Sequence, residues 1–133
     1  MALAWLFERQ HPSDGERAEQ LLATCGKVPW WIPGLWHLEV SNALLVAERR
    51  SLLPQGDSDR FLDRLSSLPF LTDSDPVAER SVRIVALARC HGLSSYDATY
   101  LELAQRLGAA LASFDRQLNR AADSIGVALF NAP

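Results

Sequence analysis

Three acidic residues in this sequence lie where an expected helix or strand begins or ends. Asp97 begins an expected helix, Asp115 directly follows the apolar run Ala109–Phe114, and Glu39 lies one turn into the helix after Pro33-Gly34. Carboxylate oxygens are the donors that suit Mg²⁺ and Mn²⁺. An ion held by them can lower the pKa of a bound water and stabilise charge on a phosphodiester. The chemistry to test is therefore metal-assisted hydrolysis.

The spacing of Asp97 and Asp115 predicts that the chain brings them to one level. A helix expected at Ser95–Leu107, with Ser95 as its N-cap, carries the chain about 15 Å away at about 1.5 Å per residue. The Ala109–Phe114 run, as a strand, returns about 16 Å at about 3.3 Å per residue. Both carboxylates then lie at the carboxyl end of this strand, where open α/β sheets place their sites.

Glu39 shares the apolar stripe of its helix with neighbours at helical spacing. These neighbours are Leu35, Trp36, Ala43 and Val46. A carboxylate on such a stripe is costly to bury unless it is paired or binds a metal. Because its helix starts just past the carboxyl end of an expected strand, we expect Glu39 to face the same edge as the other two acids.

Each acid also has a purely structural interpretation. Asp97 can serve only the dipole at a helix N-terminus. Asp115 can be only the N-cap of the helix that begins at Arg116. Glu39 can pair with an Arg from a neighbouring helix. Paired carboxylates without a metal also serve glycosidases, although nothing else in the sequence supports a sugar site.

Helical patterns alternate with short apolar runs along the whole chain, without an internal repeat or linker. Strands separated by helices indicate a parallel sheet covered on both faces, so we expect one α/β domain spanning all 133 residues. The expected helices are Ala2–Glu8, Glu16–Thr24, Leu35–Arg50, Gly56–Ser67, Val77–Cys90, Ser95–Leu107 and Arg116–Ser124. The expected strands are Val28–Ile32, Phe70–Thr72, Ala109–Phe114 and Val127–Phe130.

Composition narrows the classes of function. A net charge of −3 is not that of a protein that holds nucleic acid by bulk positive charge, but cations bound to carboxylates reverse the local sign. Lys27 is the lone lysine among 13 basic residues, and the others are arginines. Arginine suits phosphate contacts, although a GC-rich coding sequence also gives an excess of arginine over lysine. Cys25 and Cys90 form no CxxC pair, so we expect no zinc site and a reducing cytosol. No apolar run is long enough to span a membrane.

Three segments carry a family resemblance. They read PGLWHLEVSNALL at 33–45, LSSYDATYLELA at 93–104 and LASFDRQL at 111–118. Their order and spacing resemble the PIN-domain, VapC-type toxins of bacterial toxin–antitoxin pairs. The resemblance extends through Val127–Phe130 and covers nearly the whole chain.

The resemblance implies a cytoplasmic endoribonuclease that depends on Mg²⁺ or Mn²⁺, cleaves RNA, forms a homodimer and binds a cognate antitoxin. It also implies a three-layer sandwich with a central parallel sheet flanked by helices. Glu39, Asp97 and Asp115 match three of the family's acids and would be catalytic metal ligands. Ser113 matches the small hydroxyl residue two positions before the last acid and either supports the site or is an ordinary strand serine. Glu102 is either an acid behind the site or, as we favour, a solvated surface residue.

The start of the chain departs from the family pattern. The family begins with a hydrophobic strand that ends in an Asp, followed by a stretch like SVALAWL. Here Met1–Leu6, MALAWL, begins inside that stretch. We therefore expect the first strand and the fourth acid to have no counterpart in this sequence.

Two other classes of function compete with the nuclease. A phospho-receiver domain also gathers acids around Mg²⁺, but it needs a lysine near its end and the lone lysine here is Lys27. A non-catalytic domain that only binds an antitoxin is the second rival, because of the missing acid.

Other residue types give weaker signals. The histidines at positions 11, 37 and 91 share no ligand spacing. The tryptophans at positions 5, 30, 31 and 36 cluster early, which favours core packing over a partner-facing groove. The aromatic N-terminal region and Phe61–Leu68 are the candidate partner contacts.

Overall fold

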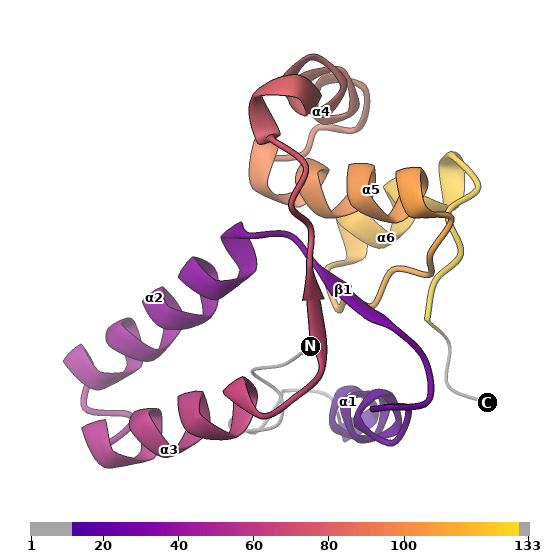
Figure 1. The fold of residues 1–133 in the computed structure, drawn as a ribbon. Coiled ribbons are helices and arrows are strands. Elements are labelled where there is room, and N and C mark those ends of the chain that lie inside the picture. The colour runs from indigo at the N-terminus through magenta and orange to yellow at the C-terminus, as the bar shows by residue number, and fades with distance from the viewer. Residues whose placement is uncertain (1–11, 131–133) are drawn as a thin grey trace.

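The computed structural model describes residues 12–130, and its elements follow the expected order (Figure 1). The helices are α1 Pro12–Leu22, α2 Leu35–Arg49, α3 Gln55–Ser66, α4 Val77–His91, α5 Ser95–Leu107 and α6 Arg116–Ser124. The strands are β1 Trp30–Ile32 and β2 Phe70–Thr72. The bounds of β2, α5 and α6 are as expected, whereas α1 begins and ends earlier than Glu16–Thr24. The expected helix Ala2–Glu8 lies outside the described residues.

The sheet is smaller than the alternation of elements suggested. β1 and β2 pair in parallel, with Trp31 opposite Leu71. The expected strands Ala109–Phe114 and Val127–Phe130 are reduced to one isolated parallel bridge between Leu111 and Leu129. Two hydrogen bonds form it: Leu111 N–H donates to the Ala128 carbonyl, and Phe130 N–H donates to the Leu111 carbonyl.

The prediction of two further full strands is therefore wrong in extent, although the direction of the pairing is confirmed. Among residues 12–130, Leu111 is the one residue of this segment that pairs with the 128–130 segment, and no backbone hydrogen bond joins the segment to β1. Within this range the α/β character of the fold is clear, but β1–β2 and the Leu111 bridge do not form one continuous central sheet.

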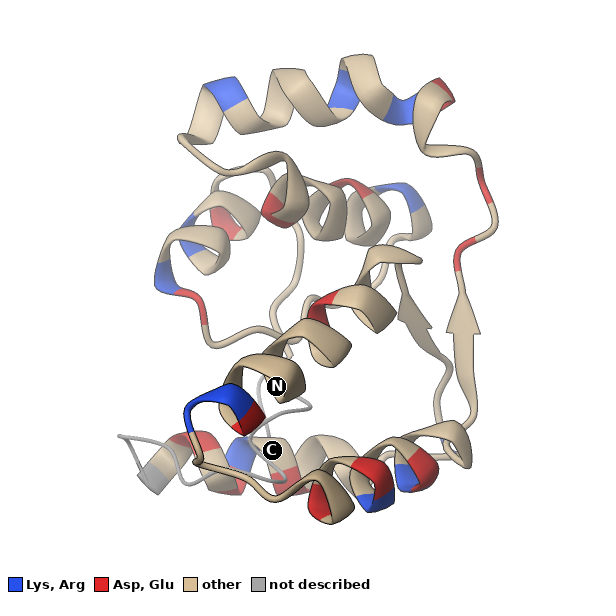
Figure 2. Ribbon diagram, turned by 90° about the vertical axis from the view of Figure 1, so that its left-hand side faces the viewer, with Lys and Arg blue, Asp and Glu red and all other residues tan. Residues whose placement is uncertain are grey.

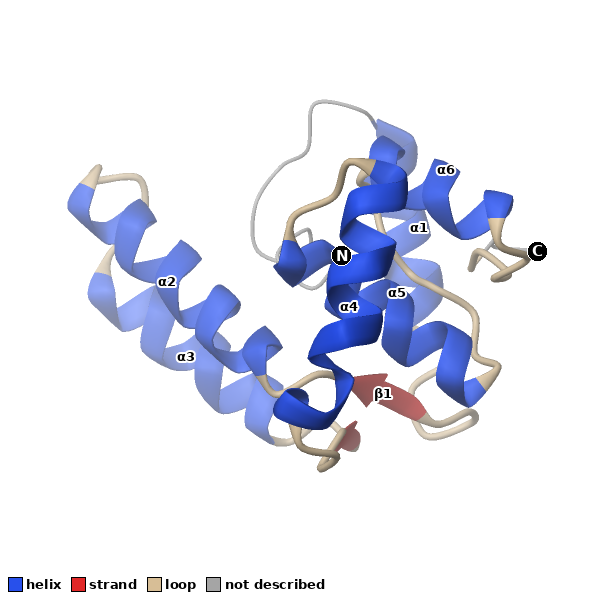
Figure 3. Ribbon diagram, turned by 90° about the horizontal axis from the view of Figure 1, so that it is seen from above, coloured by secondary structure: helices blue, strands red, loops and turns tan. Residues whose placement is uncertain are grey.

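The helices form two groups, each with its own apolar core. Helices α4, α5 and α6 pack together, with α5 between the other two (Figure 1). Their shared core includes Ile84, Leu101 and Leu118. Helices α2 and α3 form a hairpin that extends away from this group, as the view from above shows (Figure 3). Val40 and Leu44 of α2 pack there against Phe61 and Leu65 of α3.

This packing decides which side chains of α3 can meet a partner. Phe61 and Leu65 are each only 7% exposed, so the expectation that Phe61–Leu68 offers a partner surface is wrong for these two. Both face inward because they pack against Val40 and Leu44 of α2. Leu62 remains exposed.

The ends of α4 and α5 follow directly from the sequence. Gly92 and Gly108 terminate these helices in the left-handed region, with φ of 63° and 60°, where a side chain would be strained. The N-cap of α5 is Ser94 and not Ser95 as expected, because the Ser94 hydroxyl accepts the Asp97 N–H.

The described residues can be examined for membrane-spanning helices and for disulfide bonds. None of its helices is both long and apolar enough to cross a membrane. Cys25 and Cys90 are free thiols.

Candidate active site

Glu39 is held by a tyrosine of another helix. It lies in the second turn of α2, and the Tyr100 hydroxyl of α5 donates a hydrogen bond of 2.8 Å to its Oε1. The carboxylate is exposed, so the expected burial on an apolar stripe is not observed. Its partner is also not the Arg that the structural interpretation required. Glu39 therefore keeps one oxygen toward α5 while remaining accessible from solvent.

Asp97 lies in the first turn of α5 and is tied to the serine that caps this helix. The Ser94 hydroxyl lies 2.9 Å from Asp97 Oδ2 and accepts the Asp97 N–H at 3.0 Å. Because Tyr100 follows Asp97 by three positions, both side chains lie on one helix face. Asp97 therefore lies close to the tyrosine that holds Glu39.

The tyrosine hydroxyl links the two acids electrostatically. Burial, followed by the hydrogen bond and charge of Glu39 and the charge of Asp97, raises the pKa of Tyr100 far above its usual value. The raised pKa favours the protonated phenol, which donates the hydrogen bond to Glu39. Sequence reasoning missed the role of Tyr100; the signal for it was a phenol one turn after an expected site acid.

Asp115 takes part in a separate set of contacts within its own segment. Its Oδ1 accepts the Leu118 N–H at 2.7 Å, so Asp115 is the N-cap of α6. The Ser113 hydroxyl accepts the Asp115 N–H at 3.0 Å, and the Ser113 carbonyl accepts from Asn119. Ser113 thus supports the backbone before α6 rather than the carboxylate itself. Among residues 12–130 no hydrogen bond joins Asp115 to Glu39 or Asp97.

The donor chemistry of these acids suits a hard divalent ion, but their arrangement is looser than a formed site. Three carboxylates supply the oxygen ligands that Mg²⁺ and Mn²⁺ prefer. Glu39 and Asp97 lie around one hydroxyl, whereas Asp115 is connected elsewhere. In the part of the chain that the structure describes, no group of three acidic, histidine or cysteine side chains is placed to hold a metal ion.

A buried ionic network lies behind this face, and it corrects the expectation for Glu102. The Glu102 side chain is 6% exposed and pairs with Arg106, one turn later, at 2.9 Å. Arg106 also contacts Asp73 at 2.7 Å and Asp75 at 3.1 Å, in the loop that follows β2. Figure 2 shows these two acidic positions directly after the strand. Glu102 is therefore a structural ion-pair residue, as its spacing of four from Arg106 could have suggested.

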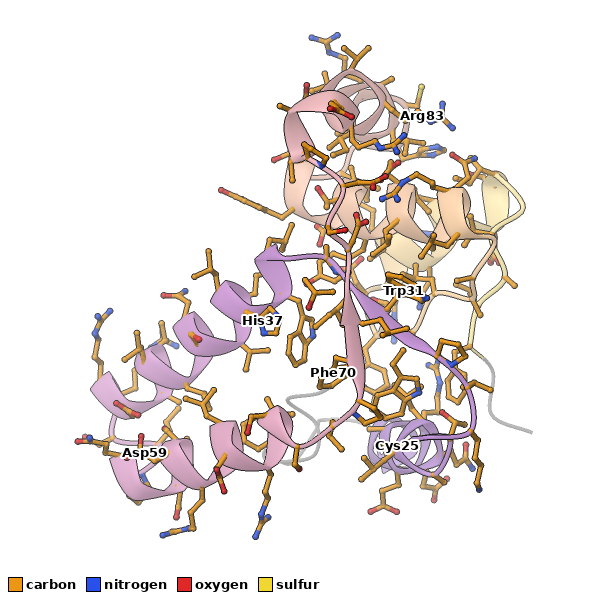
Figure 4. All side chains as sticks on the ribbon, in the orientation of Figure 1. Cys25, Trp31, His37, Asp59, Phe70 and Arg83 are labelled. Carbon is orange, nitrogen blue, oxygen red and sulfur yellow. The ribbon has the colours of Figure 1, made fainter. Side chains whose placement is uncertain are left out.

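An apolar cavity of about 460 Å³ separates β1 from the segment 109–112. Trp31, which projects from β1 in Figure 4, lines it together with Trp36, Phe70 and Tyr100. The backbone groups of Leu111 bond to the 128–130 segment, so those of Ala110 and Ala112 point the other way. Within residues 12–130 no hydrogen bond uses the backbone of these two alanines.

The cavity decides the role of the early tryptophans. Trp30 is buried, with its ring centroid 5.6 Å from that of Phe70, while Trp31 is 44% exposed. Trp30 therefore packs in the core, whereas Trp31 is partly open to solvent where it lines the cavity. Trp5 lies outside the described residues.

Comparison with known proteins places these observations in a family. The PIN domain profile matches residues 2–124. A curated relative, Ribonuclease VapC3 of Pyrobaculum aerophilum, is 36% identical over 80 residues, which are 60% of this chain. The matched region covers 61% of the length of that relative.

Proposed function

Because the chain belongs to the PIN-domain family, we propose that it is an endoribonuclease toxin of the VapC type, which hydrolyses RNA phosphodiester bonds with Mg²⁺ or Mn²⁺. The observation that carries the proposal is the family match over residues 2–124, which contains all three acids. The name of the relative, a ribonuclease, supports the reaction class.

Glu39, Asp97 and Asp115 would hold the ion. Their carboxylates are the donor type that such an ion selects. When bound, the ion supplies a Lewis acid and lowers the pKa of a water for attack on the phosphorus. The protein's own contribution would be to position these carboxylates through their neighbours.

The neighbouring polar residues would perform that positioning. Tyr100 donates to Glu39, and Ser94 donates to Asp97. Asp115 uses one oxygen to cap α6, and its other oxygen remains for the ion. Ser113 keeps the turn before α6 in place through the Asp115 N–H.

We further propose that the chain is a single domain over 1–133 with a three-layer architecture, in which β1 and the 109–112 segment belong to one central sheet. The apolar cavity between them supports this arrangement, and so does the backbone of Ala110 and Ala112, which makes no hydrogen bond within residues 12–130, because both suit a strand inserted between two others. Such a strand would complete the sheet next to Tyr100.

The biological setting that we propose is the cytoplasm, with a cognate antitoxin as partner and a homodimer as the working form. The free thiols Cys25 and Cys90 suit a reducing compartment. Light scattering of the purified chain should give the mass of a dimer, and a monomer at high concentration would refute self-association.

The test of the activity is cleavage of RNA by the purified chain with Mn²⁺, with and without a chelator. Cleavage should require the ion, and Glu39→Gln, Asp97→Asn and Asp115→Asn should each lower the rate by at least about tenfold, as for other residues that hold a catalytic metal. Asp59→Asn, an exposed carboxylate of α3 (labelled in Figure 4), is the matched control and should leave the rate unchanged.

Chelator-insensitive cleavage, or full activity of the three variants, would contradict the metal-site proposal. No cleavage together with capture of the co-expressed antitoxin would favour the alternative, a non-catalytic domain that only binds its partner.

A further inference from the structure

The carboxylates of Glu39 and Asp97 belong to different halves of the molecule. Glu39 is carried by α2, whose buried side chains Val40 and Leu44 pack against α3. Asp97 is carried by α5, which packs between α4 and α6. Figures 1 and 3 show the α2–α3 hairpin extending away from the α4–α6 group. The relative position of the two acids therefore depends on how these two halves are joined.

Few side chains connect the α2–α3 hairpin to the rest of the described structure. From α2, His37 contacts the Thr72 hydroxyl of β2 at 3.3 Å, and the Trp36 ring lies 4.8 Å from that of Phe70. These contacts tie α2 to the strands. Within residues 12–130, the bond from Tyr100 to Glu39 is the hydrogen bond that ties α2 directly to α5.

Tyr100 is built to hold its hydroxyl in one place. Its ring is half-buried and packs against the core of α4, α5 and α6, which anchors the ring to this group of helices. Only the hydroxyl reaches across to α2, where its single proton is donated to Glu39 Oε1. The same helix face carries Asp97, one turn earlier.

We propose that Tyr100 is a positioning residue, whose hydroxyl sets the Glu39 carboxylate relative to Asp97 and thereby the affinity of these acids for a divalent cation. The inference rests on the proposed function, in which both acids hold the ion. Without the hydroxyl, the Glu39 carboxylate is free to rotate and α2 loses its direct link to α5. Residues that orient metal ligands in this way typically change metal affinity by about 10–100-fold when they are removed.

The experiment measures Mn²⁺ binding to the full chain by calorimetry. Tyr100→Phe keeps the ring and removes only the hydroxyl, and it should raise the Kd by at least about tenfold, which is ~1.4 kcal/mol. Tyr96→Phe is the matched control. Tyr96 lies on the same helix and is 65% exposed, and its variant should bind Mn²⁺ within about twofold of the wild type, since changes at exposed positions usually have small effects.

A double-mutant cycle with Glu39→Gln separates positioning from a general loss of structure. Positioning through Glu39 predicts that Tyr100→Phe changes the Kd little once Glu39 is already Gln. An unchanged Kd in the Tyr100→Phe single variant overturns the inference, and so do effects that add in full, because they would show that the hydroxyl acts independently of Glu39. Failure of the wild type to bind Mn²⁺ would instead overturn the proposed function itself, and this inference with it.

Discussion

Replacement of Arg106 by Leu should strongly destabilise the protein at neutral pH. The substitution removes the cation that contacts the Glu102 carboxylate, 6% exposed, and the Asp73 carboxylate, 17% exposed. Removing one partner of a buried pair costs about 3–5 kcal/mol, because the remaining charge stays in a poorly solvated place. Asp75 is 43% exposed and contributes little, since exposed pairs give about 0–1 kcal/mol. A loss of about 3 kcal/mol is therefore expected from a domain whose total stability is about 5–15 kcal/mol.

The loss should depend on pH in a definite direction. Burial alone would raise the pKa of Asp73, but the hydrogen bond and charge of Arg106 outweigh it and hold that pKa below its usual value. A carboxyl group with a depressed folded-state pKa contributes stability above its unfolded pKa, and that stability is lost as pH falls through the folded pKa. Without Arg106, protonation relieves the buried charge instead. The difference in unfolding free energy between wild type and variant should therefore shrink as pH falls below about 4, near the ordinary carboxyl pKa.

Urea unfolding at pH 7 and near pH 3 measures this difference. Arg89→Leu is the matched control, because Arg89 is exposed at the end of α4 and such changes stay within about 0.5 kcal/mol. A loss below about 1 kcal/mol at pH 7, or an equal loss at both pH values, would refute the account of a desolvated network.

Other substitutions test the local structure and the sheet. Ser94→Ala should cost about 1 kcal/mol in thermal unfolding through loss of the α5 cap, whereas Ser95→Ala should be near neutral; equal effects would contradict the observed capping. Leu44→Ala should cost about 2–5 kcal/mol, measured by urea unfolding, because Leu44 is 2% exposed, whereas Leu38→Ala, at a site 73% exposed, should cost little. Fusing a hydrophobic strand that ends in Asp before Met1 should raise both the melting temperature and Mn²⁺-dependent RNA cleavage, since a strand would fill the cavity and a fourth carboxylate would join the acids. Equal cleavage by both forms would show that three acids suffice.

The positions of most elements could be predicted because their signals are local. Gly92 ends α4 and Gly108 ends α5, because glycine readily adopts the left-handed backbone at a helix end. The 3.6-residue spacing of apolar side chains predicts the positions of α2 and α5. Asp115 as the cap of α6 also follows from its position alone. These features depend on residues within one or two turns of each other.

The chemistry of the candidate site could be predicted only in part. The types and order of Glu39, Asp97 and Asp115 were evident, and with the quoted segments they indicated the family. The partner of Glu39 could not be predicted, because Tyr100 lies 61 residues away along the sequence and no local pattern connects the two residues. The burial of Glu102 could not be predicted either, because it depends on contacts with the loop that follows β2, which is distant in sequence.

By itself, the sequence determined the order of the helices, the family and the identity of the candidate acids, because periodicity, capping and motif spacing are properties of neighbouring residues. Only the tertiary structure decided how far the strands extend, that a cavity lies between β1 and segment 109–112, and which residue forms a hydrogen bond with each acid. The physical reason is that a strand needs several paired residues from a distant part of the chain: among residues 12–130 only Leu111 pairs with the 128–130 segment, so the Ala109–Phe114 run gives one bridge rather than a strand.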